Sequence, residues 1–197
     1  MKLSALALVF LGGLALHAGA AISPIHVDIE EHASSKPPKA TPGHPALSNI
    51  AQHRSLTIKL TNNSSEALGD IVVKYFFIGH DMKDHKLKVL QHGERKASLP
   101  PQRTATVESE GAVNTYTEAH TEIAKPKGKS KGRPRTTKVA ASGQKVVGYA
   151  VQVFSGTKLE EEKYTAPDYK QIVAESSPSL MQQPDEKKPS KKSPKKN

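Results

Sequence analysis

Alternation of apolar and polar residues is the dominant pattern along this 197-residue chain. In residues 25–30 and again in 56–61, an isoleucine, valine or leucine occupies every second position and a polar residue lies between. A period of two places alternate side chains on one face of an extended strand, so both segments are predicted to be half-buried β-strands. The stretch between them, 34–53, contains four prolines and few large apolar residues, which predicts a long irregular connection.

The strongest strand signal lies at 69–79, because apolar residues occupy both sets of alternate positions there. The first set holds Ile71, Val73, Tyr75 and Phe77, and the second holds Val72, Phe76 and Ile78. A strand that is apolar on both faces is typical of a central strand covered on both sides.

Alternation also predicts the remaining strands; it is clear at 144–154, where Val147, Tyr149, Val151 and Val153 share one side, and weak at 113–123. Their ranges are 86–91, 103–108, 113–123, 144–154 and 158–164. The turn signals His92-Gly93 and Leu99-Pro100-Pro101 separate the first two of them. The last range is charged along its length, which suits the edge of a sheet, since lysines there discourage association.

A short helix is predicted after the last strand. Residues 165–168 resemble a capping box, and Tyr169, Ile172 and Val173 have the spacing of one apolar helical face. From Glu175 onward the composition shifts to proline, serine, glutamine and lysine. Such a segment buries too little apolar area to offset its conformational entropy, so it is predicted to be disordered.

These patterns predict an all-β fold, namely an immunoglobulin-like antiparallel β-sandwich of about seven strands with a short C-terminal helix. The predicted domain covers 21–174 and contains a basic loop insertion at 124–142. A disordered Lys/Pro-rich tail is predicted at 175–197.

The first twenty residues have the features of a secretory signal peptide. Lys2 precedes an apolar run from Leu3 to Leu16 that is too short to span a membrane, and Ala18-Gly19-Ala20 has a small-x-small cleavage pattern. We therefore expect residues 1–20 to be removed. The mature chain is expected in the periplasm, at the outer membrane or outside the cell.

Composition narrows the chemistry that an exported domain of this kind can perform. The chain contains no cysteine and no tryptophan. The lack of cysteine excludes disulfides, zinc-thiolate sites and a cysteine nucleophile. The predicted domain also lacks the G-x-S-x-G, H-E-x-x-H and phosphate-loop motifs, so we predict a protein that is not an enzyme, with no catalytic residues and no cofactor.

One histidine–carboxylate cluster follows the strongest strand. It consists of His80, Asp81, Asp84 and His85. Metal ligation needs side chains that converge on one point and are held there by further hydrogen bonds. A short polar loop with two histidines is more often an ordinary turn, so no metal ligand is predicted.

The positive charge is concentrated in two segments. The formal net charge is +10, of which residues 125–138 contribute +7 and residues 185–196 contribute +4, so the rest of the mature chain carries −2. Charge segregated in this way is typical of solvated segments and of anion-binding segments. The candidate polyanion-binding residues are Lys125, Lys127, Lys129, Lys131, Arg133, Arg135 and Lys138.

Two interpretations of the basic segments stay open. Residues 129–135 resemble an AT-hook, and the tail resembles the Ser-Pro-Lys-Lys units of histone tails, but an exported chain does not meet the genome, so specific DNA binding is not expected. The insertion is then either a solvated connection between strands or a multivalent contact with acidic glycan, lipopolysaccharide or nucleic acid. Such a contact would be strongly salt-dependent.

Residues 54–64 resemble the extended strand and asparagine-serine turn of bacterial immunoglobulin-like domains. Together with 70–78 and 145–154, they are similar to small exported single-domain proteins of Verrucomicrobia, of which one group in Akkermansia is encoded near pilus-like components. The resemblance covers about 25–173 and rests on strand pattern, without the Cys…Trp…Cys core of antibody domains. It implies a structural or adaptor role with an envelope or pilus-like protein partner.

The sequence therefore predicts an exported, non-catalytic binding or structural protein of the cell envelope, accessory to a pilus-like assembly by the resemblance. Its sheet edges and loops are expected to contact a protein partner by strand pairing or through a small apolar patch. The alternative is a polyanion-binding protein that acts through the basic loop and tail. Neither interpretation includes a membrane span.

Overall fold

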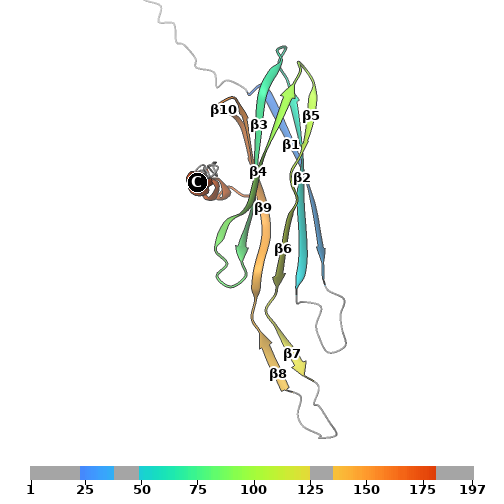
Figure 1. Cartoon of the computed structure of the whole chain (residues 1–197), viewed down its shortest axis with the longest axis vertical. Helices are drawn as coiled ribbons and strands as arrows, with labels where there is room; N and C mark the ends of the chain where they lie inside the picture. The colour runs from blue at the N-terminus through green and yellow to red at the C-terminus, as the bar shows by residue number, and fades with distance from the viewer. Residues whose placement is uncertain (1–22, 38–48, 125–134, 181–197) are drawn as a thin grey trace, which may run out of the picture.

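The computed structural model describes residues 23–37, 49–124 and 135–180, which form ten β-strands and one α-helix (Figure 1). The predicted leader and most of the two basic segments lie outside the described residues. The elements are β1 (Ile25–Lys36), β2 (Ile50–Asn62), β3 (Leu68–Asp81), β4 (Leu87–Leu99), β5 (Thr104–Glu108), β6 (Ala112–Thr117), β7 (His120–Ala124), β8 (Arg135–Val139), β9 (Ser142–Ser155), β10 (Lys158–Tyr164) and α1 (Tyr169–Leu180).

Two antiparallel sheets pack face to face. In the first sheet, β1 pairs with one side of β2, while β6 and β5 pair in turn with the N-terminal and C-terminal parts of its other side. The second sheet has the order β4-β3-β9-β10. A short ladder between β6 and β9 joins the two sheets at one end. The predicted all-β antiparallel sandwich with a short C-terminal helix is confirmed.

The hydrophobic core fills the space between the two sheets. Alternate residues of β2, namely Leu56, Ile58 and Leu60, are at most 1% exposed and pack against residues of the opposite sheet, which include Val151 and Val153 of β9. The polar residues between them face outward. The period of two that predicts these strands is therefore the direct result of having one face buried.

Strand β3 is covered on both faces, as its sequence predicts. Phe77 lies in the core between the sheets, while Phe76 and Ile78 lie in a second apolar cluster with Tyr169 of helix α1. The helix covers the outer face of the second sheet (Figure 1). It approaches β9 at Gly148, where an added Cβ would lie 2.6 Å from Cε2 of Tyr169.

Two buried amide side chains hold parts of the sandwich together. Gln52 of β2 is 2% exposed and reaches β9, where its Nε2 donates to the Val146 carbonyl at 3.0 Å and its Oε1 accepts from the Val146 N–H at 2.8 Å. Asn62 is fully buried, and its Nδ2 donates to the carbonyls of Leu99 and Pro100 at 3.2 and 3.1 Å. A buried polar group is stable only with such partners.

Strands β7 and β8 form a separate two-stranded ribbon. The ribbon projects from the end of the sandwich where β6 and β9 meet (Figure 1). The predicted basic loop insertion at 124–142 is wrong in its second part, because β8 occupies Arg135–Val139 and β9 begins at Ser142. The residues of β8 alternate too weakly between apolar and polar for a strand to be recognised from the sequence. They are extended because they pair with β7.

The predicted irregular connection at 34–53 is also shorter than expected. Strand β1 continues to Lys36, and β2 begins at Ile50. Residues 33–36 of β1 are exposed on both faces, so no buried face imposes an alternation that the sequence could display. Pairing with β2 keeps them extended instead.

Strand β4 runs unbroken through His92-Gly93, where a turn was predicted. A Cβ at Gly93 would lie 2.2 Å from the Tyr75 hydroxyl oxygen, so a glycine is needed here to let the ring of Tyr75 pack closely against β4.

Two further element boundaries differ from the predicted ones. Residues 113–123 contain two strands, and α1 continues to Leu180, past the predicted start of the disordered tail at 175.

The described residues thus contain ten strands, where about seven were predicted. None of the described helices is long and apolar enough to cross a bilayer.

Candidate binding site

The outer edge of β1 presents main-chain groups to its surroundings. Strand β1 pairs with β2 over 12 consecutive residues with no shift of register. The Asn63 N–H donates to the Pro24 carbonyl at 2.8 Å, and hydrogen-bonded pairs alternate with non-hydrogen-bonded pairs along an antiparallel ladder. The even-numbered residues of β1 therefore bond to β2. The odd-numbered residues direct their N–H and C=O groups away from it.

Within the described part of the chain, Ile25 is the only one of these residues whose outward main-chain groups bond to a neighbouring side chain. The Ser23 Oγ accepts from the Ile25 N–H and donates to the Ile25 carbonyl, both at 3.2 Å. No described residue forms a hydrogen bond with the outward main-chain groups of Val27, Ile29, Glu31, Ala33 and Ser35. Such a row of unpaired groups is a template for another strand.

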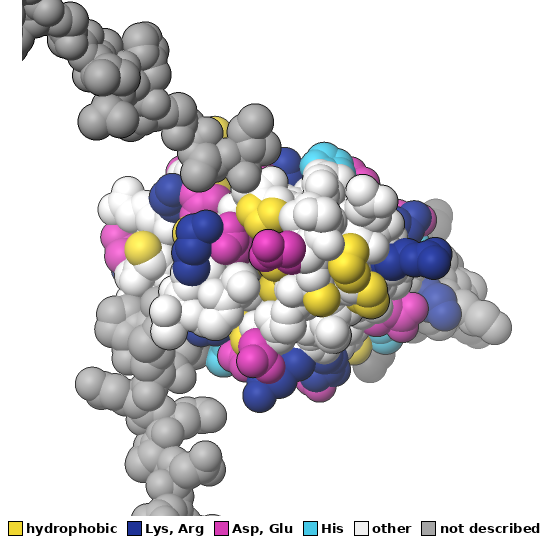
Figure 2. Space-filling view, turned by 90° about the horizontal axis from the view of Figure 1, so that it is seen from above, with side chains coloured by type: hydrophobic (Ala, Val, Ile, Leu, Met, Phe, Trp, Pro, Cys, Tyr) yellow, Lys and Arg dark blue, Asp and Glu magenta, His cyan; other side chains and the backbone are white. Residues whose placement is uncertain are grey.

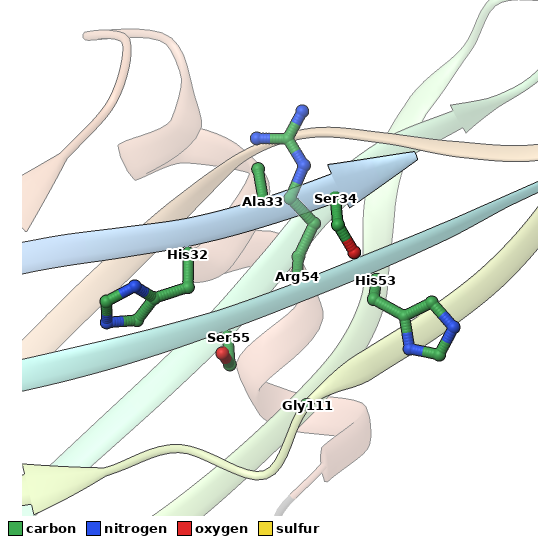
Figure 3. Close-up of a pocket in the computed structure, with 7 residues that line it drawn as sticks. All are labelled: His32, Ala33, Ser34, His53, Arg54, Ser55 and Gly111. Atoms are coloured by element: carbon green, nitrogen blue, oxygen red, sulfur yellow. The ribbon is translucent and has the colours of Figure 1, made fainter. Parts of the chain in front are cut away.

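A shallow hollow of about 250 Å³ lies where the end of β1 meets β2 and the β5–β6 connection (Figure 3). Its lining residues are His32, Ala33, Ser34, His53, Arg54, Ser55 and Gly111. Figure 3 shows Arg54 on one side of the strands and His32 and His53 on the other, with their two imidazoles directed away from each other. The polar groups do not converge on one point, as catalysis or metal ligation would require.

The guanidinium of Arg54 is engaged with Glu31 of β1. Nη1 of Arg54 donates to Oε1 of Glu31, and the two side chains are only 21% and 24% exposed. The Arg54 Nε is buried and has no hydrogen-bond partner among the described residues. Glu31 is the one charged side chain that β1 directs toward the interior of the sandwich, and Arg54 neutralises it.

The outer face of β1 is polar along its length. It carries His26, Asp28, Glu30 and His32 at alternate positions. His26 lies 3.3 Å from Asp28, His32 lies 3.9 Å from Glu30, and Nε2 of His32 lies 3.0 Å from Oγ1 of Thr57. These side chains are mostly exposed, so they contribute little stability but give the edge a distinctive pattern of charge.

Of the predicted polyanion-binding residues, the structure describes Arg135 and Lys138, both on β8. Arg135 lies opposite Ala124 of β7, and Lys138 lies opposite Thr121. The others, Lys125, Lys127, Lys129, Lys131 and Arg133, lie outside the described residues.

Acidic residues offset the cations at the base of the ribbon. His120 has a side chain that is 5% exposed, with Nδ1 at 2.7 Å from the Glu118 carbonyl and Nε2 at 3.4 Å from Glu122. Lys145 pairs with Glu118 at 3.3 Å. A hollow of about 430 Å³ lies beside His120 and Lys138. The base of the ribbon is therefore close to neutral.

The cluster at 80–85 forms a turn, as predicted. The carboxylates of Asp81 and Asp84 each accept a hydrogen bond at 2.9 Å from the main-chain N–H two residues further along. The rings of His80 and His85 lie 5.2 Å apart, and burial, together with the neighbouring His85, lowers the pKa of His80. Within the described ranges, no group of three or more possible ligands is arranged to hold a metal ion.

The end of the molecule opposite the ribbon carries charges of both signs. Figure 2 shows Lys and Arg interspersed with Asp and Glu around a small group of apolar side chains. This face therefore lacks a single-sign field that would attract a polyanion.

The Arg54–Glu31 pair was missed by sequence reasoning, although the sequence contains a signal for it. Both residues occupy positions that alternation assigns to the inner face, Glu31 after Ile29 and Arg54 before Leu56. Two opposite charges at inward positions of neighbouring predicted strands indicate an ion pair. Recognising it requires the register of β1 on β2.

Comparison with known proteins gives little. No family model and no curated protein matches the chain. Among solved structures, the chain is similar to the crystal structure of an ApaA protein from Bordetella pertussis, with 15% identity over 62% of this chain and 94% of that one and a TM-score of 0.29. A score this low does not establish a shared fold, so no property of that protein is carried over.

Proposed function

We propose that this chain is an exported, non-catalytic binding protein of the cell envelope that pairs with a strand of a protein partner at the outer edge of β1. The observation that supports this proposal is the row of outward main-chain groups on β1 that no described residue satisfies. An added strand gains affinity from main-chain hydrogen bonds and specificity from alternate side chains. Here the specificity would come from the polar residues between His26 and His32.

The edges formed by β4 and β10 carry more protection than β1. The edge strand β4 is bridged to the β5–β6 connection by an ion pair between Arg95 and Glu110 at 2.8 Å. Strand β10 is short, highly charged and interrupted by a bulge. Strand β1 has neither a bulge nor an internal proline, and its inward charge, Glu31, is neutralised by Arg54. Bulges, prolines and unpaired inward charges are the usual means of blocking an edge, so β1 suits a partner better than β4 or β10 does.

Proline substitution at Ala33 tests the edge directly. The Ala33 N–H points outward, so Ala33→Pro removes one donor from the free edge while the β1–β2 ladder stays intact. We expect Ala33→Pro to lower capture of the partner from envelope extracts about ten-fold, which corresponds to about one net hydrogen bond. Ser34→Ala is the matched control and should capture normally. Equal capture by Ala33→Pro, with unchanged circular dichroism, would contradict the proposal.

Export and the envelope location are supported by the signal-peptide pattern at 1–20, and an accessory role in a pilus-like assembly by the resemblance of residues 54–64 and their neighbours. Mass spectrometry of the protein isolated from its own cells checks this part. A mature N-terminus near Ala21 is expected. A cytoplasmic product that keeps Met1 would remove the envelope from the proposal.

Polyanion binding is a second candidate function, and the projecting β7–β8 ribbon favours it. The ribbon stands clear of the sandwich (Figure 1), and the exposed Lys138 lies on it, four residues after the lysine-rich segment 125–134. A multivalent contact of this kind would weaken steeply as salt is added.

Retention on immobilised heparin across a salt series tests the second candidate. Deletion of residues 125–134 should move elution to markedly lower salt, and Lys138→Ala should produce a smaller shift in the same direction, because fewer counterions are released. Lys88→Ala, an exposed lysine of β4, is the control and should elute like the native chain. Unchanged retention after the deletion would reject polyanion binding by this segment.

A further inference from the structure

We infer that the strand accepted by the β1 edge is β1 of a second copy of this chain, running antiparallel, with the two-fold axis passing through His32. The inference rests on the proposed function and specifies the partner of the same edge. The sheets that contain β1 in the two copies would then join into one continuous sheet across the β1–β1 contact. This arrangement is isologous, because both copies use the same edge.

The positions of the outward main-chain groups restrict the possible registers. Hydrogen bonds across the new contact must join odd-numbered residues, because only these direct N–H and C=O groups outward. With His32 opposite His32 of the second copy, Glu31 pairs with Ala33 and Ile29 pairs with Ser35. The ladder ends at Pro37, which has no N–H to donate.

Charge complementarity and ladder length together favour this register. A contact centred on Ala33 would pair Lys36 with Glu30, but it would leave three hydrogen-bonded residue pairs before Pro37, where the contact centred on His32 has four. With His32 on the axis, Asp28 lies opposite Lys36 of the second copy, and symmetry forms this pair twice. A shift that centres the contact on Glu31 places two carboxylates opposite each other on the inner side. A contact centred on Glu30 places two carboxylates opposite each other on the exposed face of the sheet. Opposed like charges are destabilising, so both of these registers are disfavoured.

The inner side of β1 also fits a second strand. Residues 33–36 are exposed on both faces, so an added strand meets no opposing sheet at this end. Ala33 lies opposite Glu31 of the second copy, and its small side chain leaves room for the Glu31–Arg54 pair to remain in place. The contact therefore buries no unpaired charge, which would be costly.

Single-cysteine variants test the register, because the chain has no cysteine of its own. Across the new contact His32 is a non-hydrogen-bonded pair, with Cα atoms about 4.5 Å apart, within reach of a disulfide. His32→Cys should give a covalent dimer under mild oxidation. Glu30→Cys is the matched control, since its two copies would lie about 13 Å apart along the strands and should form no disulfide. Preferential crosslinking of Glu30→Cys, or none at either site, would overturn the inference.

A charge exchange provides a second, independent readout. In sedimentation experiments on the intact chain, Asp28→Lys and Lys36→Asp should each lower the fraction of dimer, and the double variant should restore it. The inference would be overturned if the fraction of dimer were the same in all variants, or if the native chain stayed monomeric at every concentration. If the chain is monomeric but Ala33→Pro still abolishes capture of an envelope protein, the second copy is excluded while the proposed function stands.

Discussion

Buried amide side chains replace covalent links in this domain. The chain has no cysteine, so no disulfide can join its sheets or hold its turns. Gln52 joins β2 to β9, and Asn62 ties the end of β2 to the segment around Leu99. The sequence predicts a turn at Asn62, since asparagine favours such positions. It does not reveal that the same amide bonds to a carbonyl 37 residues away, because that contact exists only once the sandwich has formed.

Replacement of Asn62 by alanine should be severely destabilising. The side chain donates to three carbonyls and accepts from the N–H and hydroxyl of Ser64, so its removal leaves several buried groups unpaired. We expect Asn62→Ala to lower the free energy of unfolding by about 2–4 kcal/mol in urea denaturation. The exposed neighbour Asn63 provides the control, and Asn63→Ala should cost less than about 0.5 kcal/mol. Equal losses for the two variants would contradict the assigned hydrogen bonds.

We expect His80 to make folding sensitive to mild acid. Its pKa is lowered from 6.5 by burial and by nearby positive groups, so the unfolded chain binds a proton at this site more readily than the folded one does. Stability should therefore decrease as the pH falls through about 6.5. We expect the free energy of unfolding of His80→Gln to depend less on pH than that of the native chain between about pH 7.5 and 5.5. An identical dependence in the two proteins would assign the effect to other groups.

Elements with at least one buried face are those that their sequence predicts best. Strands β2 and β9 are recognisable because the sandwich buries alternate residues, and β3 is recognisable because both of its faces are apolar and covered. Strand β4 was predicted to break at Gly93, but that glycine accommodates the ring of Tyr75, a contact that no local pattern encodes. The end of β1 beyond Glu31 shows no alternation because it is exposed on both faces. The part of the candidate edge beyond Glu31 therefore lies where sequence patterns carry least information.

Helix α1 depends on a glycine in the strand beneath it. A Cβ at Gly148 would lie 2.6 Å from Cε2 of Tyr169 and 3.0 Å from Cβ of Thr165, so Gly148→Ala must displace the helix. We expect this variant to lose about 1–3 kcal/mol of unfolding free energy and to become sensitive to proteolysis within α1. Gly69→Ala is the matched control, since nothing lies within 4 Å of its added Cβ. Normal protease resistance in Gly148→Ala would contradict this packing.

The whole molecule separates its basic residues from a nearly neutral sandwich. The net charge of +10 arises mainly from segments 125–138 and 185–196, while the end of the sandwich seen in Figure 2 carries mixed charges. This separation was predictable by counting charges along the chain. The projecting ribbon was not, because its strands are stabilised mainly by pairing with each other. Binding at the β1 edge and binding by the ribbon involve different parts of the molecule, so the two candidate functions can be tested separately.

Hydrogen exchange along β1, resolved by residue with NMR, tests the central claim that this edge is open and accepts a strand. In dilute protein, the amides of His32 and Ser34 should be protected by β2, while those of Ala33 and Ser35 should exchange rapidly. As the protein concentration rises, the two odd-numbered amides should become protected and the even-numbered ones should not change. If Ala33 and Ser35 are already protected in dilute protein, or exchange equally fast at every concentration, the edge does not bind a strand as described.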